Sequence, residues 1–203
     1  VQAIDADPDF FAAKAQLAMN NMAMGNKAGF DTYAKQALAT DADLNPSEKI
    51  MKQMITTLSS SPDADMGQVA RLGKQLSASY PNVVEAHLID GYLQMQAKNT
   101  DGALQSFEKV VQLKPDYGPA HNMLGYGNMQ AGDMDKAKAH FDKYIEANPG
   151  KPNPHDSMGD YYMQAKDYGN AAKHYEKALD LDPNFEASKP KLTRAKQMMD
   201  SDK

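Results

Sequence analysis

Hydrophobic residues recur along this chain at intervals of three and four, as on one face of a helix, and do not alternate as in a strand. The segment that follows "AGDMD" shows the pattern clearly, with Ala137, Phe141 and Tyr144 at steps of four and three. This segment ends at "ANPG", where proline and glycine stop a helix. Leu124 and Gly125 lie in a preceding helix, and "AGDMD" separates the two. The pattern predicts antiparallel helix pairs joined by short turns.

The second half of the chain repeats at a step of 34 residues. The residues that recur are Gly91, Gly125 and Gly159; Ala103, Ala137 and Ala171; Phe107, Phe141 and Tyr175; and Pro115, Pro149 and Pro183. A helix pair of this size cannot bury its own apolar face and must stack on neighbouring pairs. The repetition therefore predicts an array of stacked helical hairpins.

These residues resemble the signature of the tetratricopeptide repeat family, a 34-residue helix–turn–helix with Leu-Gly, Tyr, Ala, an aromatic residue and Pro at fixed offsets. The matching residues are Leu124, Gly125, Ala137, Phe141 and Pro149 in one unit, and Met158, Gly159, Tyr162, Ala171, Tyr175, Ala178 and Pro183 in the next. The match covers residues 84–185. Histidine holds the family's tryptophan position in three units, and Asp90 replaces the usual Leu. The resemblance implies an all-α, right-handed superhelical solenoid of stacked antiparallel helical hairpins.

The phase of the repeats predicts one domain over residues 1–203, with about five hairpins and a capping helix. The expected units are 10–44 and 45–83, which are divergent, then 84–117, 118–151 and 152–185, and finally the capping helix 186–203. The second unit has five extra residues, which we place in the serine-rich loop "SSSPDAD". Ser47 is a candidate N-cap for the helix in "NPSEKIMKQMITTL". Pro190 is expected in the first turn of the capping helix.

The stretch "LGYGNMQAG", residues 124–132, resembles a glycine-rich phosphate loop when it is considered alone. Such a loop follows a strand and opens a helix, and no strand pattern precedes this stretch. Gly125 instead occupies the small-residue position shared with Gly91 and Gly159, where a side chain would separate the paired helices. Gly132 lies in the turn, where a positive φ is common. The glycines are predicted to serve packing.

The composition of the chain disfavours or excludes several classes of function. The 203 residues carry 22 Lys and Arg against 27 Asp and Glu, and this net charge of −5 disfavours binding to nucleic acid. The absence of cysteine excludes disulfides, thiolate zinc sites and cysteine nucleophiles. No apolar run reaches the ~20 residues that would insert in a membrane. Residues 3–10 resemble the end of a helix and a turn, which suggests a truncated start. The sequence does not identify the cellular compartment, although the absence of cysteine weakly favours export.

The five histidines form two series in the repeat register, His87, His121 and His155 on first helices and His140 and His174 on second helices. Equal positions on stacked helices lie about 8–10 Å apart, too far to share one ion. The first series is therefore predicted to be partly buried imidazoles facing the partner helix. We expect no metal and no cofactor. No Ser–His–Asp order, HExxH motif or facing carboxylate pair predicts an enzyme.

The resemblance implies that the first helices line a concave groove that holds a peptide. The groove positions are Leu88, Tyr92, Met95, Gln96, Asn122, Tyr126, Met129, Gln130, Asp156, Asp160, Met163 and Gln164. Met and Tyr give such a surface adaptable contact area, although each Met can also simply fill gaps between helices. These positions hold no cation, which argues against a clamp for acidic C-termini. Asp156 and Asp160 predict a preference for neutral or basic segments.

Together these features predict a non-catalytic protein–protein interaction scaffold that binds an extended peptide or helix. One alternative is a structural spacer within a longer solenoid. Another is a small-molecule or metal carrier that uses the Met-rich groove, where clustered thioethers would suit copper(I). A helical repeat that reads RNA is disfavoured by the acidic balance.

Overall fold

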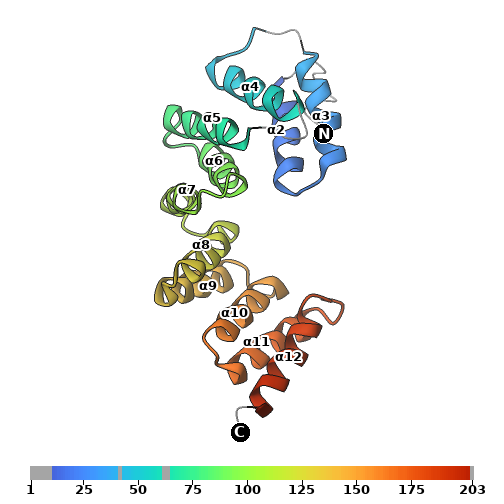
Figure 1. Cartoon of the computed structure of the whole chain (residues 1–203), viewed down its shortest axis with the longest axis vertical. Coiled ribbons are helices and arrows are strands. Elements are labelled where there is room, and N and C mark those ends of the chain that lie inside the picture. Colours follow the sequence, from blue (N-terminus) through green and yellow to red (C-terminus); the bar gives the residue numbers. More distant parts are fainter. Residues whose placement is uncertain (1–10, 41–42, 61–64, 202–203) are drawn as a thin grey trace. The chain divides into compact units, whose positions relative to one another are not determined.

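The computed structural model describes residues 11–40, 43–60 and 65–201, and within these ranges it contains eleven helices and no strand (Figure 1). The predicted all-α class is confirmed. The chain divides into two compact units, residues 1–109 and 110–203. The turn predicted near residues 3–10 and most of the serine-rich loop lie outside the described residues. In the described ranges no helix has the length and apolar character needed to cross a membrane.

The N-terminal unit is built from consecutive helices packed on one another. Its helices are α2 (Phe11–Ala23), α3 (Lys27–Leu38), α4 (Pro46–Ser60), α5 (Met66–Ser79), α6 (Val84–Gln96) and most of α7 (Thr100–Leu113). Met54, Ile55 and Val69 are fully buried at its centre. On α4 the buried residues recur at steps of three and four, which places them on one inner face of the helix; they are Ile50, Met51, Met54 and Ile55.

The C-terminal unit continues the hairpin pattern. Its helices are α8 (Gly118–Ala131), α9 (Met134–Ala147), α10 (Pro152–Gln164), α11 (Tyr168–Leu181) and α12 (Ser188–Ser201). Phe141 of α9 and Tyr175 of α11 are buried aromatic residues between the helices. The last helix, α12, packs on α11 through the fully buried Ala195, and Pro190 lies at its third residue.

The repeated glycine lets the two helices of a hairpin approach closely. A Cβ on Gly125 would lie 2.5 Å from Cε1 of Phe141, closer than packed atoms can lie. The same relation joins Gly91 to Phe107 and Gly159 to Tyr175. The predicted packing role is confirmed, because the aromatic ring of the second helix occupies the space that a side chain would need.

The turn inside each hairpin has a fixed geometry. Gly132 has φ +83°, as predicted, and Lys98 and Lys166 at the equivalent positions both have φ +59°. The next residue caps the second helix. The carboxylates of Asp133 and Asp167 accept backbone N–H groups three residues further on, which satisfies one of the free donors at a helix start.

The predicted N-cap of α4 is wrong. The helix begins at Pro46, and Asn45 caps it by accepting the N–H of Glu48 at 3.0 Å. Glu48 in turn accepts the N–H of Asn45 at 2.9 Å. Ser47 lies inside the first turn and donates its hydroxyl to Asn45. Proline is favoured at the first helical position, so the cap moves to the residue before it.

Candidate functional site

The predicted groove positions share one face of each first helix and differ in exposure. Met95, Gln96, Gln130 and Gln164 are exposed; Leu88, Tyr92, Asn122, Tyr126, Met129, Asp160 and Met163 are half-buried; Asp156 is buried. The four on α6 belong to the N-terminal unit, where Tyr92 packs edge-on against Phe107. The eight on α8 and α10 belong to the C-terminal unit, and we call these eight the first-helix surface.

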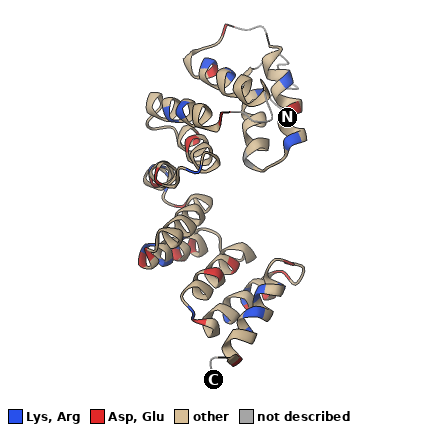
Figure 2. Cartoon of the chain, in the orientation of Figure 1, with Lys and Arg blue, Asp and Glu red and all other residues tan. Residues whose placement is uncertain are grey.

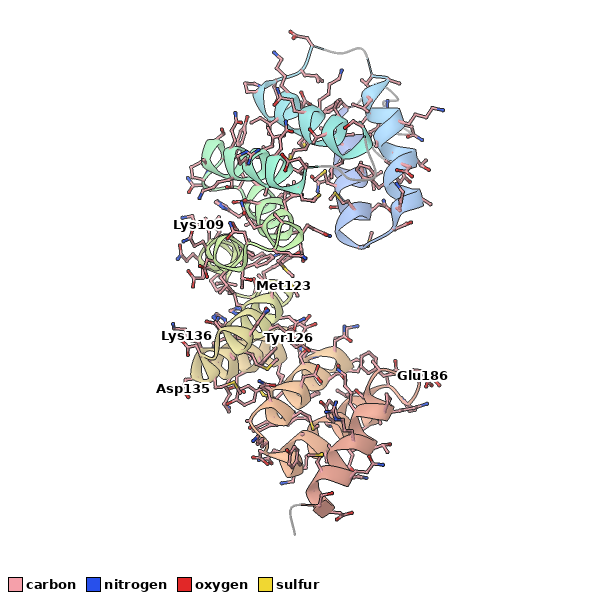
Figure 3. The ribbon with its side chains drawn as sticks, viewed as in Figure 1. Lys109, Met123, Tyr126, Asp135, Lys136 and Glu186 are labelled. Carbon is pink, nitrogen blue, oxygen red and sulfur yellow. The ribbon has the colours of Figure 1, made fainter. Side chains whose placement is uncertain are left out.

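A hydrogen-bonded network crosses the first-helix surface, centred on Asp160 of α10. Its Oδ1 accepts the hydroxyl of Tyr175 at 2.7 Å. Its Oδ2 accepts the hydroxyl of Tyr126 from α8 at 2.7 Å and the ammonium of Lys191 from α12, also at 2.7 Å. Figure 3 shows Tyr126 on α8, with Lys136 on the other side of the same hairpin. Four helices therefore meet at one carboxylate.

Lys191 also binds the second acid of this surface. Its Nζ donates to Asp156 Oδ2 at 2.7 Å, while Ser188 donates to Asp156 Oδ1 at 2.6 Å. Both oxygens of Asp156 are thus satisfied by α12. The side chains keep little exposure, 11% for Asp156, 24% for Asp160 and 35% for Lys191. We call these contacts, with those of Tyr126 and Tyr175, the aspartate–lysine network.

The environment holds the network in one protonation state at neutral pH. Burial raises the pKa of Tyr126 and of Tyr175, and the charge of Asp160 raises both further, so the two hydroxyls stay protonated donors. Burial lowers the pKa of Lys191, but its hydrogen bonds to Asp156 and Asp160 outweigh this and raise the pKa overall. The lysine therefore stays charged and offsets part of the acidic charge.

The sequence prediction missed Lys191. It lies in α12, outside the repeats from which the groove positions were carried over. The positions named from the repeats do lack a cation, yet the folded chain brings one to them. Figure 2 shows the result, with α8 free of charged residues, the two acids on α10 and basic residues on α12. Two carboxylates and one ammonium leave this surface with a single negative charge.

One polar atom of the first-helix surface lacks a partner. Oδ1 of Asn122 is buried, and no described residue of the protein donates to it. A buried acceptor left unpaired costs about 1–3 kcal/mol.

A second buried acid lies in the N-terminal unit. Asp90 of α6 is 4% exposed, and its Oδ2 accepts the hydroxyls of Ser77 and Ser106 at 2.8 and 2.9 Å. Its Oδ1 accepts the amide of Gln94 at 3.0 Å. These donors come from α5, α6 and α7. We call this group the Asp90 hub; it explains how a charged residue occupies the family's apolar position, because neutral donors surround it.

The two histidine series meet within the hairpins of the C-terminal unit. Nδ1 of His121 on α8 lies 3.1 Å from Nδ1 of His140 on α9. Nδ1 of His155 on α10 lies 3.3 Å from Nδ1 of His174 on α11. We call these the histidine pairs. The first-helix imidazoles face the partner helix as predicted, and the contact with the second series was not foreseen.

Hydrogen bonding fixes the tautomers of the first pair. Nε2 of His121 lies 2.9 Å from the carbonyl oxygen of Pro115, which can only accept, so Nε2 carries the proton. When His121 is neutral, its Nδ1 is then a bare acceptor, and Nδ1 of His140 carries the shared hydrogen. His87 makes the equivalent bond to Pro81 at 3.0 Å, but its register partner on α7 is Ser106.

Burial lowers the pKa of three of these imidazoles. It is the main cause for His140, where His121 and Lys136 add to the effect. It is also the main cause for His155, with Lys177, and for His174, with its partner His155. Asp142 opposes the shift of His174, and the Tyr162 ring stacks on that imidazole at 5.4 Å. These three imidazoles are therefore neutral at physiological pH.

Solved structures with the same fold span most of this chain. TTC0263, a thermophilic TPR protein of Thermus thermophilus, is 18% identical with a TM-score of 0.66, covering 91% of this chain and 98% of that one. MamA protein is 21% identical with a TM-score of 0.60, covering 85% and 92%. YrrB, a TPR protein with an unusual peptide-binding site, is 15% identical with a TM-score of 0.59, covering 92% and 94%. The predicted solenoid of stacked helical hairpins is thereby confirmed.

Sequence comparison locates the repeats more narrowly. One tetratricopeptide repeat profile matches residues 94–159, and a second matches residues 152–185. A comparison with curated proteins gives no significant match. The two profiles together span residues 94–185, which include the glycine, aromatic and proline residues that keep the 34-residue step except Gly91.

Proposed function

Residues 94–185 belong to the tetratricopeptide repeat family, and from this premise we propose that the chain is a non-catalytic protein-interaction scaffold. It holds a peptide or helix of a partner protein on the first-helix surface. YrrB, a protein of the same fold, has a peptide-binding site according to its description. That likeness supports the class of function and leaves the ligand to be argued from this chain.

The observation that carries the proposal is the aspartate–lysine network. It fixes Tyr126 and Asp160 in one arrangement while both stay partly accessible. A surface already ordered before binding loses less conformational entropy when a ligand arrives. The side chains around it can change conformation or donate hydrogen bonds; they are Met129, Met163 and the exposed Gln130. The surface therefore combines a rigid centre with an adjustable margin.

The charges of this surface define the ligand class. With one negative charge left over, it favours a neutral or basic segment over an acidic one. Asp156 is covered by Lys191 and Ser188, so a ligand meets Asp160 and the tyrosine hydroxyl rather than Asp156.

The test is selection of peptides from a random display library, followed by titration of the enriched sequences. We expect neutral or basic peptides, and at least a tenfold loss of affinity in the variant Gln130→Ala/Gln164→Ala/Met129→Ala. Both glutamines are exposed, but Met129 packs against the core, so circular dichroism must show that the variant stays folded before its affinity is compared. Lys173→Ala, on the exposed face of α11, is the matched control and should bind as wild type. Enriched peptides that ignore the triple variant, or that are acidic, would contradict the proposal.

A further inference from the structure

We propose that the histidine pairs are binding sites for a borderline divalent transition-metal ion such as Zn²⁺, Ni²⁺ or Cu²⁺, one ion per pair. Histidines at equal positions in successive hairpins lie too far apart to share an ion. The folded chain instead pairs a first-helix histidine with a second-helix histidine of the same hairpin. The nitrogen spacing of both pairs suits a metal, and so do the tautomer and the outer contact of His121.

The spacing of the nitrogens fits two ligands of one ion. Metal–imidazole bonds of about 2.0–2.1 Å place neighbouring nitrogens roughly 2.9–3.4 Å apart in square-planar or tetrahedral coordination. The Nδ1 atoms of the two pairs lie 3.1 and 3.3 Å apart. To share an ion, the two lone pairs must turn away from the line that joins the nitrogens, and χ2 of histidine is a torsion with broad minima.

The tautomer of His121 is already the one that a metal needs. Metal-ligating histidines usually donate their other ring N–H to a carbonyl or carboxylate, which orients the ring. Nε2 of His121 makes this contact with the carbonyl of Pro115. His140 moves its proton from Nδ1 to Nε2 when the ion binds, so a neutral pair releases no net proton. The ion takes the place of the hydrogen that the two Nδ1 atoms share.

The surroundings set the strength of binding. Within the described residues no group of three or more His, Cys, Asp or Glu side chains is placed to hold a metal. Each site therefore offers two protein ligands, and water or a partner's donor fills the remaining positions. Lys136 lies near the first pair, and Lys177, Lys138 and Asp142 lie near the second. Two ligands beside ammonium groups predict micromolar affinity, tighter at His121/His140 because its outer contact is preformed.

The test is calorimetric titration of the metal-stripped, tag-free full chain with Zn²⁺ at pH 7.5. We expect two ions per chain, and one in each of the variants His121→Gln/His140→Gln and His155→Gln/His174→Gln. His87→Gln is the matched control, since that histidine makes the same carbonyl contact and has Ser106 opposite; it should keep two ions. Absence of saturable micromolar binding, or binding unchanged in both double variants, would overturn the proposal.

A second measurement reports the metal ligands directly, and its main result comes from the wild-type chain. Cu²⁺ added to the wild-type chain at two ions per chain should give an electron paramagnetic resonance spectrum with splitting from two imidazole nitrogens per ion. The single variants His140→Gln and His174→Gln, both at half-buried positions, should each reduce half of that signal to one-nitrogen coupling. A spectrum from oxygen ligands or from a single nitrogen in the wild-type chain would refute pairwise coordination.

Discussion

The hairpin α6/α7 and the hairpins α8/α9 and α10/α11 place different chemistry at the same repeat positions. In the first, Asp90 accepts hydrogen bonds from Ser106. In the other two hairpins, the repeat position of Asp90 is occupied by the buried Leu124 and Met158. The repeat position of Ser106 is occupied in those hairpins by His140 and His174, and each of these lies within hydrogen-bond distance of a histidine on the first helix. The difference teaches that polar residues change together across a hairpin, because a buried donor needs its acceptor on the facing helix.

The largest effect is expected from removing the acid that distinguishes α6. Asp90→Ala should lower the free energy of unfolding by about 3 kcal/mol, because three donors lose a charged acceptor and a cavity remains. Urea denaturation followed by circular dichroism measures it. Ser79→Ala, at an exposed position on α5, should change stability by less than about 0.5 kcal/mol. A loss below about 1 kcal/mol for Asp90→Ala would show that the hub contributes little.

The next effect tests what the three hairpins share. Gly125→Ala should cost about 2 kcal/mol, because the new Cβ must displace the buried ring of Phe141. Gly91→Ala and Gly159→Ala should cost similar amounts, since each faces an equivalent ring. Thermal unfolding of the three variants makes the comparison. If one glycine tolerates alanine without loss, close helix approach is not common to all three hairpins.

A smaller effect is the pH dependence of stability, which we expect from the hairpins that carry histidine pairs. The pKa values of His140, His155 and His174 are lowered in the folded chain, so the unfolded chain binds more protons below about pH 6.5. Stability is therefore fully present above that pH and is lost as the pH falls towards the lowered values. Urea denaturation with a chelator present, between pH 7.5 and 5.5, should show this loss.

The pH effect has an internal control. His140→Gln/His174→Gln removes the second histidine of both pairs and should flatten the dependence. A dependence that survives the double substitution would assign it to other groups, the carboxylates included.

The smallest effect concerns the turns. Lys98 and Lys166 adopt the left-handed conformation that Gly132 adopts without strain. Replacing Lys166 by Gly should stabilise the chain by about 0.5 kcal/mol, since relief of strain exceeds the added flexibility of the unfolded chain. The shift in melting temperature measures it, and Gly132→Lys should shift it the opposite way. If the wild-type chain and the variants Lys166→Gly and Gly132→Lys are equally stable, this turn carries no strain.

Helical spacing and the 34-residue step were enough to predict the paired helices, their close approach at the repeated glycines and the turn at Gly132. These features depend on neighbours close in sequence or one repeat away, so a periodic pattern records them. Ser47 was misassigned as a cap because Asn45 and Ser47 are both good caps, and Pro46 decided between them. In the sequence Asp90 stands out only as a departure from the repeat signature. Its hydrogen bonds could not be predicted, because the donors come from three helices.

The sequence by itself determined the all-α class, the repeat length and the positions that share a helix face. Only the tertiary structure decided which polar groups meet. Lys191 reaches Asp156 and Asp160 from a helix outside the repeats. The histidine pairs join residues on facing helices of one hairpin. Periodicity fixes the direction in which a side chain leaves its own helix, whereas a hydrogen bond between helices depends on how they pack, and that follows from the burial of apolar residues along the whole hairpin.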